Sequence, residues 1–227
     1  MTPGKRTRSS ARRSLDLDQI AATALELVDR EGHGALTIRR LADELGVGAM
    51  TLYGYVRTKE EIAEHLTELA LRELEIPVEG PWDERLAQLF GNLRGLLWRH
   101  PSVAYLDTVQ PLSGPAAFRA ADAALGILAG AGLSRAHCVA GMSNLVSYTF
   151  GSALFRLHQA GATEPRRDYE RRVRLASMNE LPHIAEMAAE MLDRCGDDEF
   201  DTGLQHLIDG LRHQQRSTQI HTGIRGE

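Results

Sequence analysis

The stretch TIRRLADELGVGAMTLYGYV, residues 37–56, carries the pattern that decides the fold. Its apolar residues recur at helical spacing on both sides of the turn Gly46-Val47-Gly48, and they predict helices over about 37–45 and 49–55. Thr37 stands where a helix N-cap residue is expected. Two short helices about a tight glycine turn are the plan of a helix-turn-helix, whose second helix enters the major groove of DNA. A helical hairpin with no DNA-binding role has a similar pattern, so both interpretations stay open at this point.

The residues of this stretch divide into an inward and an outward set. The inward apolar side chains are expected to pack on a preceding helix, predicted from about Asp16 to Glu31 and ended by Gly32-His33-Gly34. The outward residues, together with the lysine that follows the stretch, are available for DNA: Thr37, Arg39, Ala49, Met50, Thr51, Tyr53, Tyr55 and Lys59.

The remainder of the chain also has helical patterning. The sequence TKEE at 58–61 has the form of a capping box and predicts a fourth helix that runs to about Leu74. Prolines and a glycine at 77–81 break this helix. Further helices are predicted near 83–99, 104–109, 114–130, 134–160, 168–178, 182–193 and 197–214. No stretch shows the sustained alternation typical of strands, and the predicted fold class is all-α.

These breaks predict four segments. Residues 1–15 form a basic, flexible arm, 16–62 a helix-turn-helix domain, 63–214 a larger helical domain, and 215–227 a polar tail expected to be disordered. The arm has no acidic residue before Asp16. Such an arm either lies along phosphates or in a narrow minor groove, or it is a solvated end without a partner.

Composition excludes several classes of protein. The 227 residues contain no apolar run near the length of roughly 20 that spans a bilayer. The basic N-terminus has no apolar stretch behind it and is not a secretory signal. Two cysteines exclude a disulfide framework and favour the reducing cytoplasm.

Charge is distributed unevenly along the chain. Residues 1–59 hold ten basic and seven acidic side chains, a net +3, whereas the remainder holds 16 basic and 24 acidic ones, a net −8. A basic head on an acidic body fits a protein that touches a polyanion with one end, although so small a difference also arises by chance.

The segment LTIRRLADELGVGAMTLYGYVRTKEEI, within residues 18–66, resembles the DNA-binding domain of the tetracycline-repressor (TetR) family. WDERL at 82–86, YTFGSALF at 148–155 and FDTGLQHLIDGL at 200–211 resemble the C-terminal domain of the tetracycline-repressor subgroup. The resemblance implies an all-α homodimeric repressor whose last long helices, here near 134–160 and 197–214, form a four-helix bundle between subunits. It also implies that the body, 63–214, binds a small molecule.

Position by position, the resemblance implies a role for each outward residue. It implies phosphate contacts from Thr37, Thr51, Tyr53, Tyr55 and Lys59. Arg39 lies where the family reads a base, and guanine is the best partner for its planar fork. Ala49 and Met50 occupy the leading positions of the recognition helix and offer only apolar contact, for instance to a thymine methyl. Gly54 stands where the family has a bulkier residue, so the resemblance implies no contact from this position.

An effector site is expected between the helices at 83–99, 104–130 and 134–160, where apolar walls with a few polar groups describe either a small-molecule pocket or a plain core. The candidates are Leu89, Leu93, Leu97, Trp98, Tyr105, Asp107, Phe118, Met142, Asn144, Ser147, Tyr148 and Phe155. Asp107 falls near the family's metal-ligating histidine, and Leu89 and Leu93 near its polar drug contacts. Magnesium-tetracycline is therefore not expected; a small apolar or aromatic molecule is.

The sequence thus predicts a cytoplasmic homodimer that represses transcription from a palindromic double-stranded operator until an effector releases it. No metal, cofactor or membrane partner is expected. The alternatives are a ligand-independent activator or architectural protein with the same head, and an all-α enzyme. The enzyme is disfavoured because no nucleophile motif, phosphate-binding loop or paired acid-base constellation is present.

Overall fold

The computed structural model describes residues 15–107, 114–161, 165–177, 181–193 and 198–223, with side chains described except at 107, 158–161, 165–167, 177, 193, 198 and 218–223. Within these ranges every regular element is a helix, as the sequence predicts. None of the described helices is long and apolar enough to cross a membrane.

The head consists of α1 (Leu17–Glu31), the short 3-10 turn η1 (His33–Ala35), α2 (Ile38–Leu45), α3 (Ala49–Leu52) and the first half of α4 (Lys59–Arg72). Local chemistry sets its helix starts. Asp16, Thr37 and Thr58 are the N-caps of α1, α2 and α4, and each side chain accepts a hydrogen bond from a backbone N–H three residues later. Glu61 accepts from the backbone N–H of Arg57 at 2.7 Å, so the predicted capping box reaches one residue further back than usual.

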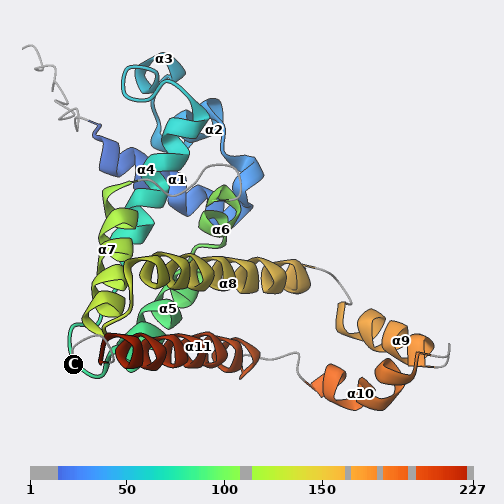
Figure 1. The fold of residues 1–227 in the computed structure, drawn as a ribbon. Helices are drawn as coiled ribbons and strands as arrows, with labels where there is room; N and C mark the ends of the chain where they lie inside the picture. Colours follow the sequence, from blue (N-terminus) through green and yellow to red (C-terminus); the bar gives the residue numbers. More distant parts are fainter. Residues whose placement is uncertain (1–14, 108–113, 162–164, 178–180, 194–197, 224–227) are drawn as a thin grey trace, which may run out of the picture.

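The body consists of α5 (Trp82–Arg99), α6 (Pro101–Asp107), α7 (Pro115–Gly130), α8 (Arg135–Gly161), α9 (Pro165–Ser177), α10 (Pro182–Asp193) and α11 (Asp198–Gly223). In Figure 1, α4 descends from the head beside α7, and α8 and α11 lie side by side across the bottom of the molecule. Helices α9 and α10 pack on each other as a pair at the far end of α8, away from the rest of the body.

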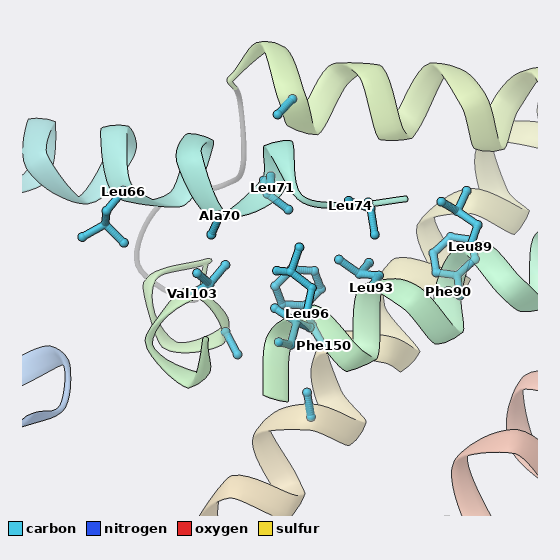
Figure 2. Packing of buried hydrophobic residues seen from close by; sticks show 14 of the residues in the cluster. Leu66, Ala70, Leu71, Leu74, Leu89, Phe90, Leu93, Leu96, Val103 and Phe150 are labelled. Carbon is cyan, nitrogen blue, oxygen red and sulfur yellow. The ribbon is translucent and has the colours of Figure 1, made fainter. Parts of the chain in front are cut away.

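One cluster of buried apolar side chains runs without interruption from Ile20 in the head to Leu211 in α11. Helix α4 provides the continuity, because Ile62 and Leu66 are buried in the same cluster as Leu71 near its far end. Figure 2 shows Leu71 and Leu74 of α4 facing a row of side chains from α5, whereas Ala70 lies above Val103 of α6, and Phe150 of α8 lies in the same layer. The predicted boundary between residues 62 and 63 therefore falls inside a helix that serves both parts.

Several predicted boundaries differ from the structure, since α6 begins at Pro101 and not near 104, and α9 begins at Pro165 and not near 168. The recognition helix ends at Leu52 and not near Tyr55, because the chain leaves the helix through turn hydrogen bonds at Gly54 and Tyr55. The tail expected to be disordered from Gln215 instead continues α11 as far as Gly223, and residues 224–227 lie outside the described part. The Gln215 amide donates to the backbone carbonyl of Ala131 at 2.7 Å, a tertiary contact that anchors this extension. The predicted arm at 1–15 lies almost entirely outside the described residues.

Candidate nucleic-acid interface and effector site

The turn between α2 and α3 depends on one glycine. Gly46 has φ +65°, the left-handed conformation that ends a helix at low cost only for glycine. The Val47 N–H then donates to the carbonyl of Ala42 at 3.0 Å, which closes the end of α2. Leu52 and Val56 are fully buried against the head, so α3 is held by its inward residues while its opposite face stays outside.

Seven of the eight predicted DNA-facing residues are exposed on this outer face, and Ala49 is half-buried. The Met50 side chain is 82% exposed, whereas Leu52, two residues later on the same helix, is completely buried. Tyr53 and Tyr55 lie beside it at 48% and 39% exposure. Three large side chains with apolar surface, held outward on a four-residue helix and its turn, form a surface suited to a partner.

The polar residues of this surface keep free hydrogen-bonding capacity. The Thr37 hydroxyl accepts from the Arg40 N–H at 3.1 Å, which leaves its own hydrogen free to donate to a phosphate oxygen. Among the residues that the structure describes, neither Arg39 nor Lys59 forms an ion pair. Both charges are therefore available to a polyanion.

Neighbouring arginines have a different task, which the sequence did not reveal. Arg40 donates to Glu31 at 2.8 Å and to Glu44 at 2.7 Å, and Arg30 donates to the same two carboxylates. The hydrogen bond from Arg40, followed by that from Arg30, holds the pKa of Glu31 below its ordinary value. This network joins α1 to α2. It also gives two adjacent arginines different roles, because Arg40 is paired with two carboxylates of the head while Arg39 is exposed.

Residues of the body join the head to α5 and α6. The His100 imidazole lies 2.6 Å from the Asp29 carboxylate of α1. The Ser102 hydroxyl donates to the backbone carbonyl of Val28 at 3.1 Å, and the Tyr105 ring stacks on His33 at 4.8 Å between centroids. These contacts place the start of α6 directly against the first helix of the head.

Helix α4 is also joined to α7 by two reciprocal contacts. The Glu68 carboxylate accepts from the Ala116 N–H, in the first turn of α7, at 2.9 and 3.1 Å. The Arg119 guanidinium of α7 donates to the carbonyls of Leu71 and Leu74, at 3.3 and 3.4 Å. An anion at a helix N-terminus and a cation at a helix C-terminus are both favourable, so each helix caps the other.

The predicted effector-site residues differ widely in their exposure. Leu89, Leu93 and Leu97 are buried, and Leu97 is completely so. Trp98, Tyr105, Met142 and Tyr148 are half-buried. Four others are exposed on the described chain: Phe118, Asn144, Ser147 and Phe155. Asp107 is the last residue of α6, and its side chain lies outside the described part.

Sequence reasoning missed the most unusual residue of the body. Arg94 on α5 is only 7% exposed, and its guanidinium lies 4.0 Å from the centroid of the Trp98 ring and 4.3 Å from that of Phe200. A pattern in the sequence could have revealed it: Arg94 has Phe90 four residues before and Trp98 four residues after, so it lies on the apolar face of its helix.

Comparison with known proteins agrees with this architecture. Residues 20–66 match the family model of bacterial regulatory proteins of the tetR family, and residues 76–215 match the tetracyclin repressor-like C-terminal domain. The chain belongs to the TetR family. The resemblance predicted for the head and for the tetracycline-repressor subgroup is thus confirmed, as is the function of a DNA-binding transcriptional regulator.

Relatives extend over most of the chain. An HTH-type transcriptional regulator of Saccharopolyspora erythraea is 36% identical over 61% of this chain, an alignment that spans 59% of that protein. The HTH-type transcriptional repressor DrrR1 of Streptomyces coeruleorubidus is 29% identical over 92% of this chain and 81% of its own. Among solved structures, ActR of Streptomyces coelicolor in complex with actinorhodin has a TM-score of 0.80 at 26% identity, covering 88% of this chain and 96% of that one.

Proposed function

We propose that the protein is a homodimeric repressor, whose α2–α3 face sits in the major groove and which a small molecule bound in the body releases from DNA. The observation that carries the proposal is the outward face of the head: Met50, Tyr53 and Tyr55 are exposed while Leu52 and Val56 are completely buried. Arg39 reads a base, and Thr37, Thr51, Tyr53, Tyr55 and Lys59 contact phosphates. Ala49 and Met50 supply apolar contact at the start of α3.

The DNA role is tested by selecting bound sequences from a random duplex library with the full chain. We expect a palindrome whose half-sites lie about one helical turn apart, roughly 34–36 Å, or a multiple of it. Arg39→Ala should weaken binding by about 1–3 kcal/mol and relax the preference at one base pair. Lys59→Ala should weaken binding to all DNA sequences by a similar factor and reduce the salt dependence of the affinity. No enrichment of any sequence, with a folded protein, would contradict the proposal.

The dimer is proposed to form through α8 and α11, which pack on each other within the chain. Two large side chains on α8 support this surface: Val139 is 55% exposed and Phe155 is 67% exposed. A twofold axis would bury both against the same helices of the partner, an isologous interface. Sedimentation should give twice the chain mass of 25.0 kDa, and Val139→Glu combined with Phe155→Glu should shift it toward the monomer. Phe118→Glu, at an exposed apolar residue on α7, is the matched control.

The effector is proposed to be a small apolar or aromatic molecule, since the structural relative ActR has been solved with actinorhodin. Its signal reaches the head through α4, which caps α7 with Glu68 and is capped by Arg119 of α7, and through α6, which lies against α1. Thermodynamic reciprocity requires that bound effector lowers the affinity for DNA by the same factor by which bound DNA lowers the affinity for effector. This factor is typically about 5- to 150-fold. Actinorhodin is a first probe: loss of operator complex on its addition supports the proposal. Operator binding that no aromatic effector changes would favour the ligand-independent regulator.

A further inference from the structure

The Met50 side chain lies outside the core of the head. Met50 is the second residue of α3, and its side chain is 82% exposed. Glycines flank it in the sequence on both sides, because Gly48 is the N-cap residue of α3 and Gly54 follows the end of the helix. Neither glycine has a side chain that could cover the thioether. The sulfur of Met50 is therefore open to small solutes.

No other methionine on the described part of the chain has comparable access. Met142 and Met191 are half-buried, and Met142 packs against the apolar core cluster. Met187 on α10 is 51% exposed. Among the eight predicted DNA-facing residues, Met50 is the only one that contains sulfur. The most accessible described methionine thus lies at the start of the proposed recognition helix.

The exposed thioether contributes little to the stability of the fold. An apolar side chain stabilises a protein by leaving water, and most of the Met50 surface stays hydrated. Together with Tyr53 and Tyr55 it forms a surface suited to a partner. In the proposed complex this surface loses its water against the base edges of the major groove. The chemical state of the sulfur should therefore affect the affinity for DNA and leave the stability of the fold unchanged.

We propose that Met50 is a site of reversible oxidation, at which hydrogen peroxide converts the thioether to a sulfoxide and thereby weakens binding to DNA. The S–O bond forms as the O–O bond of the peroxide breaks, and the sulfur gives up two electrons. The second peroxide oxygen takes up the proton of the transferred oxygen and leaves as water. Methionine sulfoxide reductases reverse the change. This inference rests on the proposed role of α3 in DNA binding.

The loss of affinity follows from the polarity of the product. A thioether makes an apolar contact, for instance with a thymine methyl, whereas the sulfoxide oxygen is a strong acceptor that carries bound water. Removing this water without supplying a donor is unfavourable, and we expect the affinity for DNA to fall about tenfold.

The first experiment treats the full-length chain with hydrogen peroxide and follows the oxidation of each methionine by mass spectrometry. The tryptic peptide Leu41–Arg57 contains Met50 as its only methionine and has no cysteine or tryptophan. We expect Met50 to be oxidised before Met142, because the rate follows exposure. The affinity for the duplex selected from the random library, measured by fluorescence anisotropy, should fall at an unchanged Tm. Sulfoxide reductases should restore it. Oxidation of Met50 that leaves the affinity unchanged would overturn the inference.

Variants identify the responsible sulfur. Met50→Leu keeps an apolar side chain and removes the sulfur, so peroxide should leave the affinity of this variant at its own value before treatment. Met187→Leu, at an exposed methionine on α10, is the matched control and should lose affinity as the wild type does. Both variants retain the two cysteines. Loss of DNA binding by peroxide-treated Met50→Leu would therefore assign the response to another residue and overturn the inference.

Bound DNA provides the last test, since it should shield Met50 and leave Met187 open. We expect the selected duplex to slow the oxidation of Met50 and not that of Met187. Equal rates at Met50 with and without a duplex that the chain binds would overturn this inference while DNA binding stands. If the untreated chain enriches no duplex, the proposed function fails and this inference fails with it.

Discussion

Removing the Glu68 carboxylate should weaken the attachment of α4 to α7 and destabilise the chain by an amount that the contact geometry sets. The side chain is only 15% exposed, and both of its oxygens lie within 3.1 Å of the Ala116 N–H. In Glu68→Ala this N–H, in the first turn of α7, loses its partner inside a partly buried contact. The change also removes the negative charge that faces the positive end of the α7 dipole.

The expected magnitude is about 2 kcal/mol. A hydrogen bond to a charged group contributes roughly 1.5–3 kcal/mol, and a carboxylate near a helix N-terminus roughly 0.3–1 kcal/mol, part of which the same bond already includes. The Arg72 guanidinium, 3.6 Å away and half-exposed, adds little. Glu68→Gln should lose about half as much, because its amide oxygen still accepts. For a chain of this size about 2 kcal/mol corresponds to a fall in Tm of roughly 4–8 °C.

Urea unfolding followed by circular dichroism measures the loss. All variants are compared at one protein concentration, because dimerisation contributes to apparent stability. Glu26→Ala, an exposed residue on α1, is the matched control and should lie within about 0.5 kcal/mol of the wild type. Equal midpoints for Glu68→Ala and Glu26→Ala would refute the reasoning that this carboxylate joins the two helices.

Three further outcomes are expected. Gly203→Ala should destabilise α11 by about 1–3 kcal/mol, because its Cβ meets Tyr148, whereas Gly210→Ala, in open space on the same helix, should stabilise it in thermal melts. The hydrogen bond from Arg212 holds the pKa of Asp83 below 3.8, so this pair stabilises the fold above that pH and is lost as pH falls through the lowered pKa. Unfolding midpoints of wild type and Arg212→Gln should therefore converge in acid, and a constant gap would contradict the pairing. Thr58→Ala should cost about 1 kcal/mol in urea unfolding, since α4 loses its N-cap.

The head was predictable because its determinants are local. The N-caps Asp16, Thr37 and Thr58, and the turn glycine Gly46, act on residues within a few positions of themselves. A period of 3.6 residues then assigns Leu52 to the inside and Met50 to the outside without knowledge of any other helix. The family resemblance concentrates in the same segment, and the match to residues 20–66 confirms it.

The body depends on contacts that no local pattern encodes. Periodicity identifies an apolar face, but the packing of other helices decides what meets it, which is why Phe118 is exposed although it was expected to line a pocket. Arg94 meets Phe200 from a helix more than a hundred positions later, and Glu68 meets Ala116 across 48 positions. Such pairs form only when helices cross at particular angles, and those angles result from the packing of all the side chains between them. The residue sequence by itself thus determined the helices of the head and the exposed face that we propose binds DNA, whereas tertiary packing alone placed a buried cation between two rings.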